Sequence, residues 1–276
     1  MVNATRRILR LTAAAALLYG AGALLVSLIQ PRLLYFPGPA PDVTPGELGL
    51  DAERVTLGTA DGERLDAWFL PAEAPRGVVI FSHGNAGNLV GRVPAARSLR
   101  EMGYSVLLYD YRGFGASTGS PGEEGTYLDA EAAYRWTLDT AGFEPRQVIA
   151  YGRSLGGGVA VELALRQPLA ALVLECTFTS IPDMAARLYP WIPLRWFPCI
   201  EYDNLAKIGQ VEVPIAIAHS ADDQLVPVEM GAALAEAAAE PVEWLPGTGG
   251  HNGPGALGQP ATRDRLERFL RAAVGE

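Results

Sequence analysis

The segment Gly152-Arg153-Ser154-Leu155-Gly156 constrains this chain more than any other part of its sequence. The apolar run Val148–Tyr151 precedes it, and small and apolar residues from Gly156 to Arg166 follow it. This order predicts a strand, a tight turn and a helix, with a serine hydroxyl exposed above the end of a sheet. Glycines fit on both sides because a Cβ would clash in so sharp a bend. The pattern makes Ser154 a candidate nucleophile, and the alternative is a glycine-rich strand–helix turn without chemistry.

A second serine fits the same five-residue pattern, which shows that the pattern alone is weak. Gly115-Ala116-Ser117-Thr118-Gly119 runs into Ser120-Pro121-Gly122, and no helix follows it directly. Clusters of this composition are typical of turns and loops. We therefore expect Ser117 to be a loop residue, and only Ser154 to have the context of a nucleophile.

Apolar strand patterns alternate with helical patterns along most of the chain, which favours a mainly parallel sheet covered by helices on both faces. The expected strands are 54–57, 65–70, 77–82, 105–110, 148–151, 170–175, 214–219 and 242–245. The expected helices are 93–102, 127–140, 156–166, 229–239 and 263–274. The turn residues Thr59-Ala60-Asp61-Gly62 join the first two strands as an antiparallel hairpin at one edge. With 276 residues and 49% hydrophobic content, one large α/β domain over 53–276 is expected.

One segment, about 181–208, breaks this alternation and is too long for an ordinary loop. Its aromatic residues and prolines are Tyr189, Pro190, Trp191, Pro193, Trp196, Phe197 and Pro198. We interpret it as a small cap over the active site. An ordinary packed helix with aromatic anchors is the alternative.

The first thirty-two residues resemble a membrane segment. Arginines between Arg6 and Arg10 precede Leu11–Ile29, nineteen residues without a charge, which as a helix would be about 28 Å long. The basic flank favours a cytoplasmic N-terminus, with the rest of the chain on the extracytoplasmic side. A cleaved signal peptide is the alternative, because Ala21-Gly22-Ala23 resembles a cleavage site. With an uncleaved anchor, residues 33–52 would form a stalk and connecting segment, with Tyr35 and Phe36 near the membrane interface.

Charge and cysteine content limit the partners of the domain. The net charge is −9, and every acidic residue lies at or beyond Asp42. So acidic a domain is a poor nucleic-acid binder. The two cysteines, Cys176 and Cys199, could pair in an oxidising compartment or remain free thiols. No residue spacing suggests a metal site.

A serine nucleophile requires a general base, and histidine is the plausible residue type here. His83 and His219 each end a predicted strand, whereas His251 lies in the late glycine-rich loop Gly247–Gly253. In this arrangement the chain order is serine, acid, histidine, so only His251 qualifies as the base. His219 is then expected to be structural.

The acid is expected just after the strand that ends at His219, where Asp222 and Asp223 stand together. We favour Asp223, which would accept a hydrogen bond from Nδ1 of His251 and hold its tautomer. Asp222 would then be a solvated turn residue or a cap for the following helix. For the oxyanion, the backbone N–H groups of Leu155 and Asn85 are the expected donors, with Ala86 as the alternative to Asn85.

Six segments together resemble membrane-anchored proteins of the α/β-hydrolase superfamily. They are Leu33–Pro37 (LLYFP), His83–Asn88 (HGNAGN), Asp110–Gly115 (DYRGFG), Gly152–Gly157 (GRSLGG), Ala221–Pro227 (ADDQLVP) and Gly249–Asn252 (GGHN). The chain departs from the family at Ser220, where glycine is frequent, and at Gly253, where aspartate is frequent. The resemblance implies an α/β-hydrolase fold and a catalytic triad. Relatives include lipid hydrolases, esterases and protein depalmitoylases.

The sequence therefore predicts a membrane-anchored serine hydrolase that cleaves carboxylic esters or thioesters through an acyl-enzyme and requires no cofactor. The apolar cap and the anchor favour acyl or lipid-like substrates. A serine peptidase or acyltransferase with the same triad is one alternative. A non-catalytic binding protein with this fold is the other.

Overall fold

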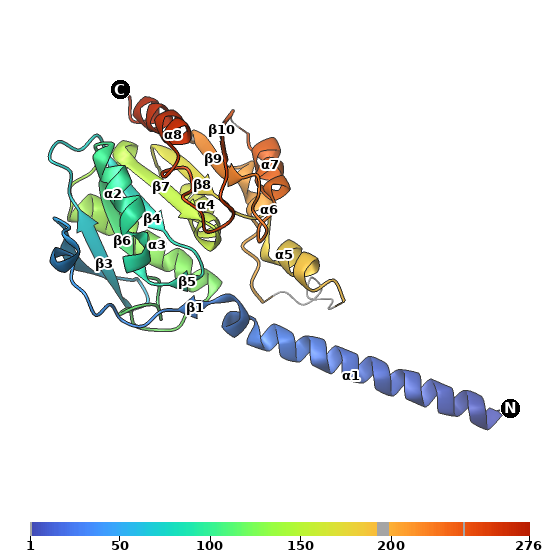
Figure 1. Ribbon diagram of the computed structural model, residues 1–276. Helices are drawn as coiled ribbons and strands as arrows, with labels where there is room; N and C mark the ends of the chain where they lie inside the picture. Colours follow the sequence, from blue (N-terminus) through green and yellow to red (C-terminus); the bar gives the residue numbers. More distant parts are fainter. Residues whose placement is uncertain (1, 192–198, 240) are drawn as a thin grey trace.

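The computed structural model describes residues 2–191, 199–239 and 241–276. The main strands are β2 (Glu53–Gly58), β3 (Arg64–Leu70), β4 (Val78–Ser82), β6 (Ser105–Tyr109), β7 (Val148–Arg153), β8 (Ala171–Glu175), β9 (Ile215–Ser220) and β10 (Val242–Gly247). They form one eight-stranded sheet in the order β10-β9-β8-β7-β4-β6-β3-β2 (Figure 1). Each of the eight predicted strands overlaps one of these strands.

The sheet is parallel except at one edge. From β10 to β6 all neighbours are parallel, whereas β3 is antiparallel to both β6 and β2. Strands β2 and β3 form the predicted hairpin, and their register pairs Leu57 with Leu65. Because the other strands run parallel, their carboxyl ends meet at one edge of the sheet, where ligands bind in open α/β sheets.

Helices cover both faces of the sheet, as the alternating pattern predicts (Figure 1). They are α2 (Val93–Glu101), α3 (Glu123–Asp139), α4 (Leu155–Arg166), α6 (Asn204–Ile208), α7 (Val228–Ala237) and α8 (Pro260–Ala273). In β4, Val78 and Ile80 belong to the core cluster shared with α3 and α4, while Val79 and Phe81 belong to the one shared with α2 and α8. All five residues of β4 are buried, because a strand covered on both faces needs apolar side chains on both.

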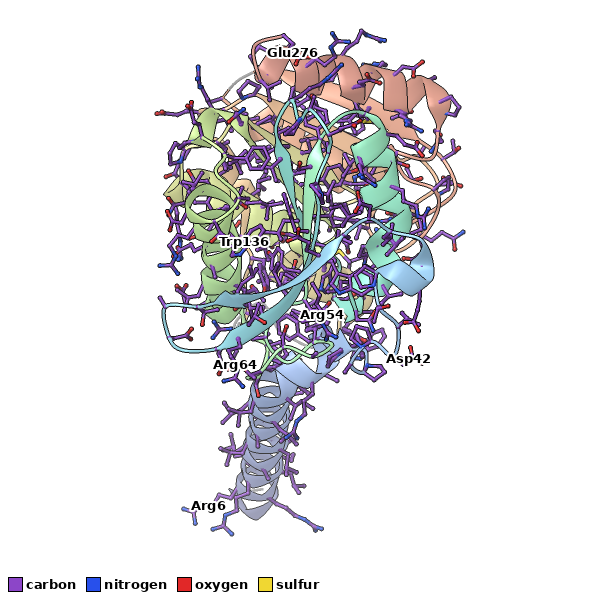
Figure 2. All side chains as sticks on the ribbon, turned by 90° about the vertical axis from the view of Figure 1, so that its left-hand side faces the viewer. Arg6, Asp42, Arg54, Arg64, Trp136 and Glu276 are labelled. Carbon is purple, nitrogen blue, oxygen red and sulfur yellow. The ribbon has the colours of Figure 1, made fainter. Side chains whose placement is uncertain are left out.

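Helix α1 (Val2–Leu34) extends away from the sheet, with Arg6 near its far end (Figures 1 and 2). Among the described residues it is the only helix long and apolar enough to cross a membrane. The apolar span is Thr5–Val26, and its most apolar window has a mean hydropathy of 1.7 and no buried residue. A signal sequence would meet the same criteria. Pro31 lies inside the last turns of this helix.

The segment after α1, expected to be a stalk, instead packs against the domain. Tyr35 is only 4% exposed, and its hydroxyl lies 2.8 Å from that of buried Tyr202. The short strand β1 (Phe36–Pro37) pairs with β5 (Ala86–Gly87), and Leu50 is buried. Tyr35 therefore lies in the core and not at a membrane interface, because its ring and hydroxyl both find partners there.

Part of the predicted cap is described. Helix α5 (Ile181–Leu188) is capped by Ser180, whose hydroxyl accepts a hydrogen bond from the Asp183 N–H, and it lies near the end of α1 (Figure 1). Helix α6, at the other end of the segment, packs against α4 and α7 and thus belongs to the body of the domain. Four of the residues that suggested a cap, Pro193, Trp196, Phe197 and Pro198, lie outside the described residues.

We predict that Tyr35 stabilises the domain. Replacing Tyr35 by Ala should lower the free energy of unfolding by about 3–5 kcal/mol, because a large buried side chain is lost. Tyr35→Phe, which removes only the hydroxyl, should cost about 1 kcal/mol. Urea unfolding of the full-length protein in detergent would measure both. Phe36→Ala is the control, since Phe36 is 54% exposed; equal losses for the Tyr35 and Phe36 alanine variants would contradict this role.

Candidate active site

The turn between β7 and α4 places Ser154 at the carboxyl edge of the sheet. Ser154 has φ 54° and ψ −119°, a left-handed conformation that costs energy for a residue with a side chain. Hydrogen bonds hold it there. Its N–H donates to the Glu175 carbonyl (2.8 Å), and its carbonyl accepts from the Gly157 N–H (2.9 Å) and the Thr177 hydroxyl (2.8 Å). The neighbouring strand and the first turn of the helix thus fix the serine in a strained geometry.

The two flanking glycines are required by close backbone contacts. A Cβ on Gly156 would lie 1.9 Å from the carbonyl oxygen of Ser82 in β4, and a Cβ on Gly152 would lie 2.3 Å from that of Gly156. Neither contact can relax by moving a side chain, because backbone atoms are involved. The structure therefore supports the reason given for these glycines from the sequence.

The structure brings together the three side chains predicted for the triad. Nε2 of His251 lies 3.0 Å from Oγ of Ser154, and Nδ1 of His251 lies 2.8 Å from Oδ2 of Asp223. Oδ1 of Asp223 accepts hydrogen bonds from the backbone N–H groups of Leu225 (2.9 Å) and Val226 (2.8 Å). The carboxylate is fully buried and the imidazole is 11% exposed. Since the carboxylate can only accept, Nδ1 carries the proton, and Nε2 is free to accept the serine proton.

The other aspartate, Asp222, has a role beyond those expected. It is exposed, and its carboxylate accepts hydrogen bonds from the N–H groups of Gly249 (2.9 Å) and Gly250 (3.1 Å), immediately before His251. These bonds lower the pKa of Asp222. Asp222 is therefore a solvated turn residue, as one of the two alternatives expected, and it also holds the histidine loop; it is not the cap of α7, which begins after Pro227.

Arg153 supports the same loop from the other side. Its guanidinium donates to the carbonyls of His251 (3.1 Å) and Gly253 (3.2 Å). Gly253 is where the sequence departs from the family pattern, and a Cβ there would lie 2.2 Å from the carbonyl oxygen of Gly249. An aspartate at this position would thus require a different loop path.

His219 is structural, as the sequence argument expected. Its Nε2 lies 2.9 Å from the Val226 carbonyl, in the loop that carries Asp223. Burial lowers the pKa of His219, so the neutral ring that donates through Nε2 is favoured. Cys176, His219 and Asp223 could together hold a metal by distance, but both oxygens of Asp223 and Nε2 of His219 already have hydrogen-bond partners. We therefore interpret this cluster as support for the acid loop.

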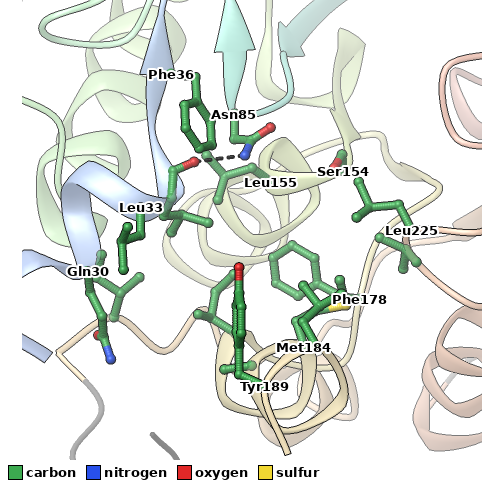
Figure 3. Close-up of a pocket in the computed structure, with 16 residues that line it drawn as sticks. Gln30, Leu33, Phe36, Asn85, Ser154, Leu155, Phe178, Met184, Tyr189 and Leu225 are labelled. Carbon is green, nitrogen blue, oxygen red and sulfur yellow. Dashed lines mark hydrogen bonds between the residues drawn. The ribbon is translucent and has the colours of Figure 1, made fainter. Parts of the chain in front are cut away.

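The loop after β4 has its own buried support. Nδ1 of His83 lies 2.6 Å from the Gly84 carbonyl, and its Nε2 lies 3.3 Å from Oδ1 of Asp110. Both side chains are fully buried, and burial raises the pKa of Asp110. The side chain of Asn85 donates to the Leu34 carbonyl (2.7 Å), which ties the loop to the end of α1 (Figure 3). Asn85 and Leu155, the expected oxyanion donors, both border the cavity beside Ser154.

An apolar cavity of about 450 Å³ opens beside Ser154 (Figure 3). Its walls come from three places: the end of α1 with Leu33, helix α5 with Met184, and the body of the domain with Phe178. Gln30 of α1 and Tyr189, which directly follows α5, also line it (Figure 3). The contribution of α1 was not expected from the sequence, since no local pattern indicates that this helix ends over the active site.

The remaining predicted residues also find places. The Ser117 hydroxyl accepts from the Asp66 N–H (2.9 Å) and donates to the Asp110 carbonyl (2.8 Å), so it fixes a loop. Cys176 and Cys199 are both free, the first buried and the second exposed. Burial raises the pKa of the Cys176 thiol to about 12, which makes it unreactive at neutral pH.

Sequence reasoning missed Asp222, Arg153 and the pair His83–Asp110 as supports of the catalytic loops. The signals were present, since each lies inside one of the motifs that carry the resemblance. Their partners, however, lie between 27 and 100 positions away along the chain. Spacing within one motif cannot reveal such pairs.

The fold and this arrangement of serine, histidine and aspartate define a class of enzymes, the hydrolases with an α/β-hydrolase fold. Comparisons with known proteins agree. A family model described as "Serine aminopeptidase, S33" matches residues 73–204. The α/β hydrolase domain-containing protein WAV2 of Arabidopsis thaliana is 33% identical over 250 residues, which cover 78% of this chain and 80% of WAV2. The chain belongs to the α/β-hydrolase superfamily.

Two further proteins that are similar to this chain have names that state an enzymatic activity. The lysophosphatidylserine lipase ABHD12 of Danio rerio is 35% identical over 183 residues, covering 59% of this chain and 47% of the lipase. The solved structure of the Pyrococcus furiosus esterase Pf2001 matches with a TM-score of 0.73 over 88% of this chain and all of the esterase. At 22% identity, the esterase supports the fold alone.

We predict that Asp222 positions His251. Asp222→Ala should lower kcat for a carboxylic ester by about tenfold, because two N–H groups of the glycine-rich loop lose their acceptor. Stability should change little, since the side chain is exposed. The pKa of Asp222 is lowered in the folded protein. Its carboxylate therefore stays ionised and holds the histidine loop above the unfolded pKa, and this support is lost only as the pH falls through the lower folded value. Ester kinetics across pH would measure this effect, with the exposed Asp264→Ala in α8 as the control. An unchanged kcat in Asp222→Ala would refute it.

Proposed function

We propose that this protein is a membrane-anchored serine hydrolase that cleaves carboxylic ester or thioester bonds through an acyl-enzyme. The observation that carries the proposal is the continuous hydrogen-bonded chain from Ser154 through His251 to Asp223. It begins at a strained serine beside a cavity and ends at a fully buried carboxylate. Each group has the position that its chemical role requires.

In the proposed reaction, Oγ of Ser154 attacks the carbonyl carbon while Nε2 of His251 takes the serine proton. The tetrahedral intermediate carries a negative oxygen, for which the backbone N–H groups of Leu155 and Asn85 are the donors. Leu155 is the first residue of α4, and N–H groups at a helix start lack partners within the helix. His251 then gives its proton to the leaving oxygen or sulfur, and the ester bond breaks. Water attacks the acyl-enzyme in the same way, which restores Ser154.

The cavity supports acyl substrates. It is apolar over most of its walls and, at about 450 Å³, falls within the usual size range of ligand pockets. Phe178, Met184 and Leu188 can surround an acyl chain whose carbonyl lies at Ser154. The name of one similar protein, a lysophosphatidylserine lipase, agrees with this class of substrate.

The membrane location is part of the same proposal. Helix α1 is apolar over a length that can span a bilayer, and its last turns contribute Gln30, Leu33 and Leu34 to the cavity wall. Basic residues near Arg6 favour a cytoplasmic N-terminus, so the catalytic domain would be extracytoplasmic. A cavity that adjoins the anchor lies close to lipid substrates.

Peptide hydrolysis is a second candidate, favoured by the family model described as "Serine aminopeptidase, S33". The same triad can cleave amides or transfer an acyl group to another acceptor. A non-catalytic binding role would leave the hydrogen-bonded triad without a use. Turnover of esters, thioesters and amides that share one acyl group would distinguish these activities.

We predict that Ser154 carries the reaction. Ser154→Ala should abolish covalent labelling by a fluorophosphonate probe and lower kcat for an ester by about 10⁴-fold or more. Ser117→Ala is the matched control, because Ser117 has the same five-residue pattern but lies in a loop. It should retain labelling. Absence of labelling in the folded wild-type protein would contradict the proposal, and so would labelling that persists in Ser154→Ala.

We also predict that the α5 side of the cavity selects acyl length. Ala185→Trp should fill part of the cavity and lower kcat/KM for a long-chain ester at least tenfold relative to an acetyl ester. Arg187→Trp, on an exposed position of the same helix, should leave the ratio unchanged. A series of p-nitrophenyl esters would measure it. Equal ratios in both variants would place the acyl chain elsewhere.

A further inference from the structure

A second cavity, of about 430 Å³, borders segments next to the catalytic residues. It is bordered by the start of α2, by Arg153 at the end of β7, and by the loop from Asn252 to Gly258. Arg153 directly precedes Ser154, and Asn252 directly follows His251. This second cavity therefore borders the two chain segments that carry the nucleophile and the base, and it shares no lining residue with the acyl cavity beside α1 and α5.

Two arginines, Arg92 and Arg153, border this second cavity and have no ion-pair partner among the described residues. Arg92 donates from Nη2 to the Ala86 carbonyl (2.6 Å), while its Nε is buried and has no hydrogen-bond partner among the described residues. Arg153 donates to the carbonyls of His251 and Gly253. In the part of the chain that the structure describes, neither guanidinium has a carboxylate oxygen within 4.0 Å. The arginines that do form ion pairs with aspartate or glutamate there are different ones.

The charge of these groups is poorly compensated. Burial lowers the pKa of Arg92, the positive charge of Arg153 lowers it further, and the negative charge of Asp110 opposes this only in part. Arginine nevertheless stays protonated in proteins. The lowered pKa of Arg92 therefore indicates that two positive charges lie near each other in a partly desolvated environment. The loop carbonyls that both side chains contact explain part of their placement. They do not neutralise the charge, and they leave Nε of Arg92 without a partner.

One acidic group also borders the second cavity. Glu175 is buried, and its Oε2 accepts from the Tyr151 hydroxyl (2.5 Å), while Oε1 has no partner among the described residues. The other walls near the arginines are Ser98, Phe81 and Leu257, which carry no charge. Two guanidiniums and one carboxyl group leave the second cavity positive, within a chain whose net charge is −9.

We propose that the second cavity binds an anionic group, a phosphate or a carboxylate, on the leaving part of the substrate. The inference rests on the proposed function, because a leaving part exists only if an ester or thioester is cleaved. With the acyl chain in the apolar cavity, the leaving part points across Ser154 and His251 toward Arg153 and Arg92. Guanidiniums bind phosphate and carboxylate through charge-assisted, often paired hydrogen bonds. The preferred substrate is therefore an acyl ester or thioester whose leaving part is an anion.

The test compares full-length protein variants in detergent on three esters that share a six-carbon acyl chain. One is a neutral acylglycerol, one its glycerol phosphate counterpart, and one an O-acyl hydroxy acid. Wild type should prefer at least one anionic ester over the neutral one in kcat/KM. In Arg92→Met this preference should fall about tenfold or more, chiefly through KM, whereas Arg92→Lys should retain most of it. Arg97→Met is the matched control, because the guanidinium of Arg97 also contacts a backbone carbonyl, that of Leu48, but lies outside the second cavity. The two anionic esters distinguish a phosphate from a carboxylate ligand.

A wild type without preference for either anionic ester would overturn the inference, and so would a preference that Arg92→Met leaves unchanged. Binding of inorganic phosphate to the inactive Ser154→Ala protein, measured by calorimetry, gives a readout that needs no turnover. It should be lost in Ser154→Ala/Arg92→Met, and equal binding in both would also refute the site. If none of the three esters is cleaved and the fluorophosphonate probe does not react, the proposed function fails. If the neutral ester is cleaved and neither anionic ester is preferred over it, only the anion site fails.

Discussion

The close approach of α4 to the sheet at Ser154 is the constraint on which the rest of the site depends. Gly156 lies so near the carbonyl of Ser82 in β4 that no Cβ fits between them, and Ser154 takes a positive φ in consequence. A free peptide would leave this conformation, since a residue with a side chain gains energy by doing so. Here the hydrogen bonds with Glu175, Gly157 and Thr177 hold it, and those with Glu175 and Thr177 require that β7 and β8 are paired. The reactive geometry thus follows from completion of the sheet.

The strained turn gives the serine a position, but the base and the acid come from loops that must be fixed separately. Arg153 is adjacent to the nucleophile and contacts the carbonyl of His251, while Asp222 is adjacent to the acid and contacts the N–H groups before His251. Both supporting residues, Arg153 and Asp222, are thus neighbours of one triad residue in the sequence and form hydrogen bonds to the loop that carries His251. This arrangement explains how a histidine among glycines, which favour many backbone conformations, can keep its Nε2 within 3.0 Å of Ser154.

Local patterns were enough to predict the sheet, its edge hairpin and the three residues that the structure brings together. Strands such as Val78–Ser82 are apolar on both faces, and the order serine, aspartate, histidine restricted the base to a single residue. Contacts between segments that are distant in the sequence could not be predicted from these local patterns. Tyr35 contacts Tyr202, which lies 167 positions away in the sequence, and Asn85 contacts Leu34, which lies 51 positions away. The sequence near Tyr35 and near Asn85 does not indicate these partners. The acceptor role of Asp222 was missed for the same reason, since it depends on a loop 27 positions later.

The end of α1 bears on whether the N-terminal segment is an anchor or a cleaved signal. Cleavage after Ala23 would keep Gln30, Leu33 and Leu34, and so would preserve the cavity wall. It would also leave Leu24, Leu25 and Leu28, each more than half exposed, at the start of the mature chain in water. Contiguous exposed apolar surface of this kind is unfavourable for a soluble protein but is satisfied inside a bilayer. An uncleaved helix would both keep the cavity wall and cover the exposed leucines. The residues that complete the acyl cavity would then continue directly into the segment that the lipid covers. This continuity supports an anchor that is also a structural part of the proposed active site.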